Sequence, residues 1–378
     1  MDFTPKAEEK LFRKIVATFV EKEVIPFADE LEKKGEFPVK LFKRAGELGY
    51  YGLRYPTKYG GTNTNTLMFC ILCEELARGW MSLAMITAMQ SLMGTNFIYK
   101  FGTEDHRKRL LVPAIRGEKI TAFALTEPGA GTDLEAIQTT ARKEKDHYVL
   151  NGAKTWITNA PVADFFTVLA YTDKDKGLKG VNFFLVEKGT PGFSIGKKIN
   201  KISVKGMIIS EIAFDNCKIP LKNMLGKDGE GYQQLQEILA EIRIMTAALS
   251  IGLARGALDE CIKYSQERIQ FGRPIGKFQA IRMKLGEMAT ELEAARLLVY
   301  YAAWLIDKKE SCMKEASMAK LFASEMANRI VDEGTRIHGA YGITEEFPIQ
   351  RFYRDARFLL YGGGTSEILK LIIGREMR

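Results

Sequence analysis

The apolar residues of this chain change their spacing twice, and this change constrains the fold more than any other feature. Over residues 5–116 they recur at helical intervals, as in the series Leu11, Ile15, Val16, Phe19 and Val20. Near Lys119 the pattern becomes short β-branched and aromatic runs, at 120–125, 147–150, 155–158, 165–171, 181–186 and 211–214. Turn signals separate these runs, and Asn151-Gly152 predicts a tight hairpin. Helices are therefore followed by a compact β region.

After Gly226 the helical period returns in long amphipathic runs at 231–269, 277–308 and 312–338. Runs of this length suit an antiparallel bundle. We therefore predict an α+β protein with an N-terminal helical domain (1–117), a middle β domain (118–225) and a C-terminal helical bundle (226–378).

The charge of the chain excludes one class of function. The 55 Lys and Arg residues exceed the 47 Asp and Glu residues, giving a net charge of +8 over 378 residues, but the two signs are interleaved throughout. A protein that binds nucleic acid gathers its basic residues on one face. We therefore expect no nucleic-acid partner.

The five cysteines are odd in number and scattered, which favours reduced thiols in a reducing, cytoplasmic compartment. Cys70 and Cys73 lie in an apolar helical run, so we expect buried structural thiols. No apolar segment resembles a signal peptide or a membrane span, because polar residues interrupt the most apolar stretch, 80–98. Three histidines and the absence of nucleotide-loop or zinc motifs predict no metal centre.

Five segments carry candidate chemistry. Taken singly, each has an ordinary reading as a glycine turn, a core tryptophan or a helix end. Glycines let backbone amides approach an anion or a flat ring, and arginine suits a pyrophosphate. The segments are 125–133 (L-T-E-P-G-A-G-T-D), 151–159 (N-G-A-K-T-W-I-T-N), 266–275 (Q-E-R-I-Q-F-G-R-P-I), 336–342 (R-I-H-G-A-Y-G) and 361–368 (Y-G-G-G-T-S-E-I).

In this order, the segments resemble the acyl-CoA dehydrogenase family from the N-terminal helices to Arg378. The resemblance implies the same three-domain fold, FAD as cofactor, an acyl-CoA substrate and an electron-transfer flavoprotein as electron acceptor. It also implies a homo-oligomer, expected to be a tetramer, in which a neighbour completes each FAD site.

The resemblance assigns site residues position by position. Thr132 is expected near the CoA chain, and Trp156 and Thr158 beside the flavin ring. Arg268, Phe271 and Gln279 are expected to contact the FAD of a neighbouring subunit. The family usually has glutamine in place of Arg336 and glycine in place of Ala340. The implied FAD contacts are Leu125, Thr126, Gly131, Thr132, Trp156, Ile157, Thr158, Arg268, Phe271, Gln279, Arg336, Ile337, His338, Gly339, Ala340, Thr365 and Glu367.

The chain departs from the family at the catalytic base. A glutamate normally removes the α-proton, at the position of Gly363 in many members and at that of Ile242, before Arg243, in others. Neither position has a carboxylate here. Glu241 is the nearest candidate, with Glu237 one turn earlier, although a shift of one residue turns a side chain by ~100° around a helix. The backbone N–H of Gly363 can still polarise a thioester carbonyl, so Arg243 and Gly363 are predicted to meet the substrate with Thr132.

Three functions remain open at this point. The first is α,β-dehydrogenation of a branched, cyclic or otherwise unusual acyl-CoA. The second is a redox-neutral elimination that needs no α-proton base, as in the related desulfinases. The third is a non-catalytic flavin-binding subunit. We favour the first.

Overall fold

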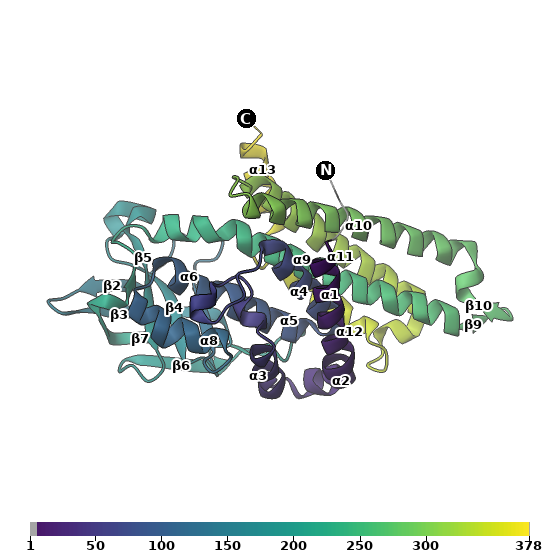
Figure 1. Ribbon diagram of the computed structural model, residues 1–378, viewed down its shortest axis with the longest axis horizontal. Helices are drawn as coiled ribbons and strands as arrows, with labels where there is room; N and C mark the ends of the chain where they lie inside the picture. The colour runs from purple at the N-terminus through teal and green to yellow at the C-terminus, as the bar shows by residue number, and fades with distance from the viewer. Residues whose placement is uncertain (1–5, 378) are drawn as a thin grey trace.

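Helices fill the first third of the chain, as predicted (Figure 1). The structure, a computed structural model, describes residues 6–377. The helices are α1 (Ala7–Phe19), α2 (Ile25–Lys34), α3 (Val39–Glu47), α4 (Thr66–Gly79), α5 (Met81–Ala88), α6 (Gly94–Phe101), α7 (Glu104–His106) and α8 (Val112–Ile115). A π-helical turn, Met89–Met93, joins α5 to α6.

The middle region is an eight-stranded sheet with the order β6-β7-β3-β2-β4-β5-β8, and β1 pairs with β4 in parallel. Its strands are β1 (Thr121–Ala124), β2 (Thr140–Lys143), β3 (His147–Thr158), β4 (Phe165–Tyr171), β5 (Val181–Glu187), β6 (Phe193–Lys198), β7 (Ile209–Pro220) and β8 (Met224–Leu225). Most neighbours are antiparallel, which lets one face of the sheet pack inward while the other encloses a small core of its own.

The prediction of a tight hairpin at Asn151-Gly152 is wrong, because β3 continues through both residues. The register between β3 and β7 shifts between Leu150 and Gly152, which marks a bulge. Gly152 has φ +140°, and a Cβ there would lie 2.6 Å from Thr139 Oγ1. Glycine is needed here for a close approach within the sheet, not for a turn.

The last third is the predicted helical bundle. Its helices are α9 (Gly231–Glu267), α10 (Gln279–Asp307), α11 (Met313–His338), α12 (Ile349–Ala356) and α13 (Ser366–Arg375), with a small hairpin of β9 (Ile269–Gln270) and β10 (Arg273–Pro274) between α9 and α10. At ~1.5 Å per residue, α9 is ~55 Å long. It runs from the sheet to the opposite end of the molecule, where the hairpin lies (Figure 1).

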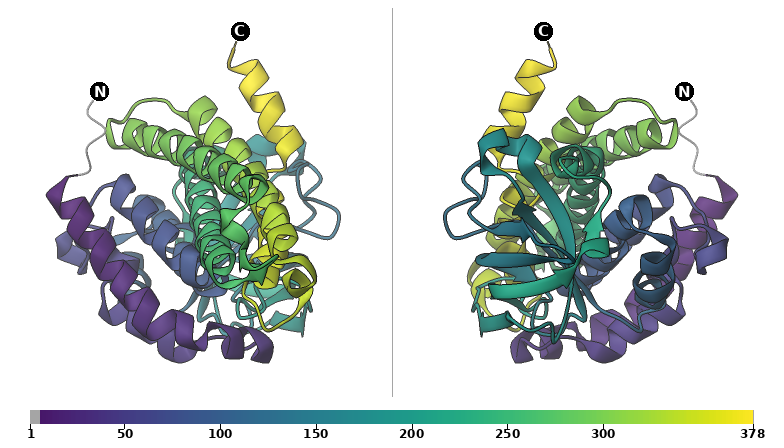
Figure 2. Two further views of the ribbon diagram at one scale, coloured as in Figure 1. Left: turned by 90° about the vertical axis from the view of Figure 1, so that its right-hand side faces the viewer. Right: turned by 90° about the vertical axis from the view of Figure 1, so that its left-hand side faces the viewer.

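One large hydrophobic core joins the three regions. Buried residues of the N-terminal helices, of the inner face of the sheet and of the bundle form a single cluster. The side views in Figure 2 show the first helices and the sheet packed around the long helices of the bundle. The predicted α+β fold class is thus confirmed, and α9 lies where all three regions meet.

The cysteines and the ends of the apolar stretch at 80–98 are buried, as their sequence context predicted. All five thiols are free and buried, and Trp80 and Ile98 are both fully inaccessible to solvent. Across residues 6–377, none of the helices combines the length and the apolar character that a membrane crossing needs.

Candidate active site

A buried ion pair fixes the glycine loop that follows β1. The Lys154 ammonium lies 2.8 Å from a Glu127 carboxylate oxygen and donates to the Leu125 carbonyl at 3.0 Å. The backbone N–H groups of Gln138 and Thr139 donate to the same carboxylate. Burial alone would raise the pKa of the Glu127 carboxyl, but Lys154 and the other donors lower it overall. Burial lowers the pKa of Lys154 to about 8 despite Glu127. The pair is therefore charged at neutral pH and holds the loop backbone in place.

The outer side of this loop is open. A Cβ on Gly129 or Gly131 would meet no atom within 4 Å. Thr132 is exposed, and the Thr126 carbonyl accepts a 2.9 Å hydrogen bond from the Thr155 N–H, which ties the loop to β3. The loop is therefore open at Gly129, Gly131 and Thr132, and it lies beside β3.

Trp156 projects out of β3 instead of packing in the core. The register of β3 against β7 shifts between Lys154 and Ile157, and Trp156 adopts φ +60° with 58% of its surface exposed. Its neighbour Ile157 is buried. Thr158 is nearly buried, and its hydroxyl contacts only the Met207 sulfur, at 4.0 Å, among residues 6–377. The bulge thus exposes a flat aromatic face next to a hydroxyl donor.

A second group of predicted cofactor residues lies at the other end of the molecule. Phe271, at the tip of the β9–β10 hairpin, has φ +50° and is 93% exposed. The Arg268 guanidinium lies over the Tyr341 ring at 5.6 Å, and Gln279 begins α10 with its side chain exposed. Figure 1 shows this hairpin at the end of the long axis opposite the sheet. One chain therefore does not bring these residues to Trp156.

The 336–340 segment belongs to this distant group. It ends α11 and continues into a 3₁₀ turn, where Gly339 has φ +62°. The His338 ring stacks on Tyr264 at 4.1 Å and is buried, as is Ile337. Arg336 is exposed and pairs with Asp332 at 2.9 Å, and Ala340 is also exposed.

A third group surrounds the loop before α13. Gly363 and Gly364 have φ +74° and +109°, and the Thr365 side chain caps α13. A Cβ on Gly363 would lie 3.8 Å from the Ile242 side chain and 3.1 Å from Thr246 Oγ1. The two base positions that the resemblance marks therefore converge on one point, far apart in sequence. Glu367, in the first turn of α13, is exposed.

Two buried cations, Lys320 and Arg243, lie near the Gly363–Gly364 loop. The Lys320 ammonium donates to the carbonyls of Leu360, at 3.2 Å, and Gly364, at 2.6 Å. Burial lowers the pKa of Lys320 to about 8, and the positive charge of Arg243 contributes to this lowering. Arg243 is 4% exposed, and burial lowers its pKa too. Within residues 6–377, the Arg243 guanidinium contacts only the Met313 sulfur and Ser317 Oγ, and its Nε has no partner.

Glu241 faces the N-terminal helices. Its carboxylate accepts from Arg54, from Lys100 at 3.3 Å and from Asn96 at 3.4 Å. Burial would raise the pKa of Glu241, but Arg54 and Lys100 lower it overall. A carboxylate held by these donors is a weaker base than a free one, since base strength follows pKa. Glu241 as the proton acceptor stays a prediction.

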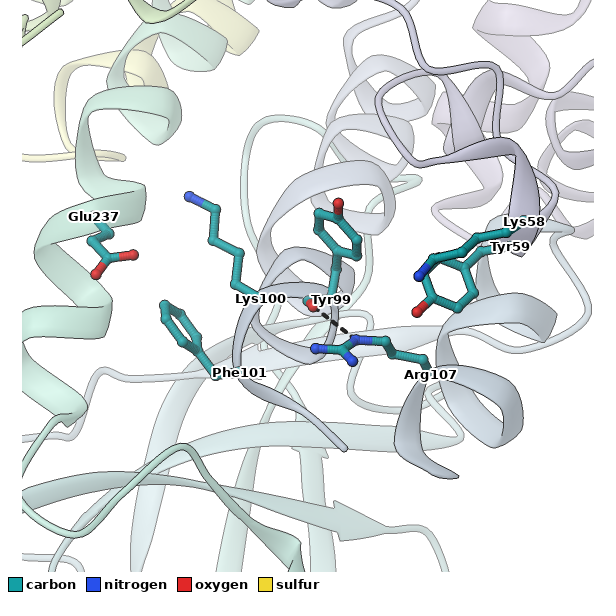
Figure 3. A pocket seen from close by; sticks show the side chains of 7 residues that line it. All are labelled: Lys58, Tyr59, Tyr99, Lys100, Phe101, Arg107 and Glu237. Carbon is teal, nitrogen blue, oxygen red and sulfur yellow. Dashed lines mark hydrogen bonds between the residues drawn. The ribbon is translucent and has the colours of Figure 1, made fainter. Parts of the chain in front are cut away.

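An open cavity of about 440 Å³ lies beside this ion-pair cluster, between α6 and α9 (Figure 3). Lys58, Lys100, Arg107 and Glu237 supply its charged groups, and Arg107 also donates to the Tyr99 carbonyl at 2.9 Å. Glu237 faces this cavity from α9, and Lys100 extends from α6 into the same space. The cavity lining includes neither Gly363 nor the glycine loop.

Comparison with known proteins identifies the family. Family models described as the N-terminal, middle and C-terminal domains of acyl-CoA dehydrogenase match residues 6–118, 122–217 and 229–378. Over 378 residues, the whole of both chains, the protein is 49% identical to "Benzylmalonyl-CoA dehydrogenase" of Aromatoleum aromaticum. The chain belongs to the acyl-CoA dehydrogenase family.

Two further curated relatives and three solved structures agree. "3-(aryl)acrylate reductase" of Clostridium sporogenes is 43% identical over the whole of both chains, and "Caffeyl-CoA reductase-Etf complex subunit CarC" of Acetobacterium woodii is 41% identical over 97% of each. The butyryl-CoA dehydrogenase of Megasphaera elsdenii aligns over all of both chains with a TM-score of 0.97 and 38% identity. A chain from the structure of the electron transferring flavoprotein of Acidaminococcus fermentans gives 0.97 and 39%, covering 100% of this chain and 99% of that chain. A chain solved as PigA with FAD and proline gives 0.96 and 30%, covering 100% and 99%.

These findings confirm the predicted family, its fold and its enzyme class, an oxidoreductase of the acyl-CoA dehydrogenase family. Members of this family use FAD, and the exposed Trp156 ring, with the Thr158 hydroxyl and the open glycines beside it, fits a flavin, because it offers a flat apolar ring next to a hydroxyl donor. The domain boundaries and the role of each site residue stay predictions.

Sequence reasoning missed the residues that support the site. Lys154 lies inside the recognised N-G-x-K-x-W motif, so the motif itself could have pointed to its ion pair with Glu127. Arg54, Lys100 and Lys320 have no such signal, since each finds its partner far away in the chain.

Proposed function

We propose that the protein is an FAD-dependent acyl-CoA dehydrogenase that forms or reduces the Cα=Cβ bond of an unusual acyl-CoA thioester. The observation that carries this proposal is the exposed Trp156 ring beside the Thr158 hydroxyl and the open glycine loop, an arrangement that suits a flavin ring. When bound, FAD takes up the β-hydrogen as hydride. The chain's own residues then have to bind the thioester and stabilise the electron pair that develops at Cα.

The thioester is held by backbone and side-chain donors that the chain retains. The Gly363 N–H is proposed to polarise the thioester carbonyl, which stabilises the enolate that develops at Cα. Thr132, on the exposed side of the glycine loop, is proposed to meet the CoA chain. Trp156 shields one side of the flavin from water.

The names of the relatives support an aryl-bearing acyl group. The Aromatoleum protein is named for benzylmalonyl-CoA, the Clostridium protein for arylacrylates and the Acetobacterium protein for caffeyl-CoA. Each of these acyl groups carries an aromatic ring at Cβ. We extend this substrate class to the present chain.

An electron-transfer flavoprotein is the proposed redox partner. One relative is named as a subunit of an Etf complex, and one matching chain comes from the structure of an electron transferring flavoprotein. No G-x-G-x-x-G nicotinamide fingerprint follows a strand in this sequence.

A second copy of the chain is proposed to complete each FAD site. Arg268, Phe271, Gln279 and the 336–340 segment lie at the end of the molecule away from Trp156, with Phe271 almost fully exposed. A neighbouring subunit that presents this end supplies a guanidinium for the pyrophosphate. The proposed assembly is a tetramer.

The test is anaerobic mixing of the flavin-loaded protein with butyryl-, isovaleryl- and 3-phenylpropionyl-CoA and their enoyl counterparts. Bleaching of flavin absorbance by a saturated thioester, or reoxidation of reduced flavin by an enoyl thioester, supports the proposal. A redox-neutral elimination is the second candidate, because Ile242 and Gly363 supply no carboxylate base. It predicts release of a leaving group with no change in the flavin spectrum.

A further inference from the structure

Two buried cations, Arg243 and Lys320, lie near the Gly363–Gly364 loop, and neither forms a salt bridge within residues 6–377. Arg243 is 4% exposed, and no carboxylate pairs with it within residues 6–377. Burying an unpaired ion costs several kcal/mol even after the surroundings relax. Such a cost is recovered when a ligand brings the missing anion.

The neighbours of Arg243 do not neutralise it. Lys320 is a second buried cation, and both of its bonds go to backbone carbonyls. Burial lowers the pKa of both groups. At Lys320 the nearby Glu325 carboxylate raises the pKa and the charge of Arg243 lowers it, so the two cations lie close enough to repel. Ser317 offers a neutral hydroxyl at 3.2 Å.

The carboxylate that stands nearest in sequence is already paired. Glu241 accepts from Asn96 and Lys100 of α6 and from Arg54 of the turn before α4, all in the N-terminal region. Ile242, the next residue, points its methyl groups at the place where a Gly363 side chain would stand. Arg243, the residue after Ile242, is thus a buried cation next to a position where the reaction ordinarily needs a base.

We propose, resting on the function proposed above, that the substrate carries a carboxylate on Cα, that Arg243 binds it, and that loss of CO₂ replaces removal of the α-proton. The bond between Cα and the carboxylate carbon breaks, CO₂ leaves, and its electron pair stays on Cα as the thioester enolate. The enolate then expels the β-hydrogen as hydride to the bound FAD, which is reduced by two electrons. No proton has to be removed, so no base is required.

The parts of the pocket divide this work. Arg243 supplies affinity and orientation for the carboxylate, since a charge-assisted, bidentate contact is the strongest that a guanidinium makes. The Gly363 N–H stabilises the enolate oxygen. Ile242 adds an apolar contact beside the carboxylate, which suits the neutral CO₂ that leaves.

The first experiment offers the acyl groups of the panel above with and without a carboxylate on Cα. Ethylmalonyl-CoA is compared with butyryl-CoA, and the carboxylated 3-phenylpropionyl thioester with its plain form. We expect the carboxylated member of a pair to bleach the flavin at least ~10²-fold faster, the usual worth of the missing base, with one CO₂ released per flavin reduced. Equal or faster bleaching by the plain thioester, without CO₂, overturns the inference and leaves the dehydrogenase function standing. If no thioester of either kind affects the flavin, the proposed function itself fails.

The second experiment measures binding, apart from turnover. Malonyl-CoA has no β-hydrogen and cannot reduce the flavin, so calorimetry gives its Kd against that of acetyl-CoA. We expect malonyl-CoA to bind at least ~10-fold more tightly, as a charged hydrogen bond of ~1.5–3 kcal/mol allows. Arg243→Gln should abolish this preference, and Arg243→Lys should restore part of it. A preference that survives in Arg243→Gln overturns the role of Arg243.

The matched control for these variants is Arg142→Lys, which changes an exposed arginine of β2 paired with Glu144. It should leave both Kd values unchanged.

A gain-of-function variant tests the same inference without removing the arginine. Ile242→Glu places a carboxylate at a family base position, so plain thioesters should bleach the flavin faster while the carboxylated ones slow by repulsion. Faster bleaching by the carboxylated thioesters would contradict the inference.

Discussion

The edge of the sheet around Trp156 and the site before α13 around Gly363 differ in how their charged groups are paired. At the sheet, a bulge exposes Trp156, and a buried ion pair braces the glycine loop. Near the loop before α13, Ile242 and Gly363 supply no carboxylate, and Arg243 has no carboxylate partner within residues 6–377. Under the proposed function, hydride transfer and the handling of the electron pair at Cα are separable tasks that fall on different elements of the fold.

The largest expected effect tests how far the sheet depends on its brace. Lys154→Met removes one member of a buried pair and leaves Glu127 charged without a partner. Breaking such a pair costs ~3–5 kcal/mol, so chemical denaturation should show a loss of unfolding free energy of that order. The double variant Lys154→Met with Glu127→Gln should recover part of the loss. A single variant as stable as the parent would mean that the loop is held by its backbone alone.

The next effect concerns Glu241, which links the pocket to the N-terminal helices. Its folded-state pKa is lowered, so its stabilisation is present above the unfolded pKa of ~4.3 and is lost as pH falls through the folded value. Glu241→Gln should lower the free energy of unfolding at pH 7, and it should flatten the fall in stability below pH 4.

The same Glu241→Gln variant also tests whether Glu241 acts as the catalytic base. If Glu241 takes the α-proton, as its position in the sequence predicts, flavin reduction by a plain acyl-CoA should slow by at least ~10²-fold. Stopped-flow absorbance gives this rate independently of the stability measurement. If the variant reduces its flavin as fast as the unmutated protein but is less stable, Glu241 serves the ion-pair cluster alone.

Arg268→Ala tests whether the distant hairpin serves the flavin site. Loss of a charge-assisted contact to a phosphate of ~1.5–3 kcal/mol should raise the Kd of FAD by ~10- to 100-fold. Ultrafiltration followed by flavin fluorescence measures the free cofactor. Arg273→Ala is the control, since Arg273 lies on the same hairpin but packs over Phe278 at 4.4 Å. Equal FAD loss in both variants would point to a general change in the hairpin.

Trp156→Phe carries the smallest expected effect. The ring is already 58% exposed, so little folding energy depends on it. Aromatic stacking is worth ~0.5–1.5 kcal/mol, so the smaller ring should weaken FAD binding by no more than ~10-fold. Thermal unfolding without FAD should be unchanged. A large drop in that melting temperature would show that Trp156 supports the fold instead of the cofactor.

The sequence by itself determined the order of helical and β regions, the fold class and the family, because hydrophobic period and short motifs are local properties. It also identified the two positions that lack a carboxylate. It misread Asn151-Gly152 as a turn, because a glycine needed for a bulge and a glycine needed for a hairpin look alike until the neighbouring strand is known.

Only the tertiary structure decided which charges meet. Packing of α9 against the N-terminal helices, α11 and the loop before α13 gives Glu241 three donors, leaves Arg243 without an anion and brings Ile242 to Gly363. Burial and distance between residues far apart in the chain set these energies, and neither is encoded in any short stretch of sequence.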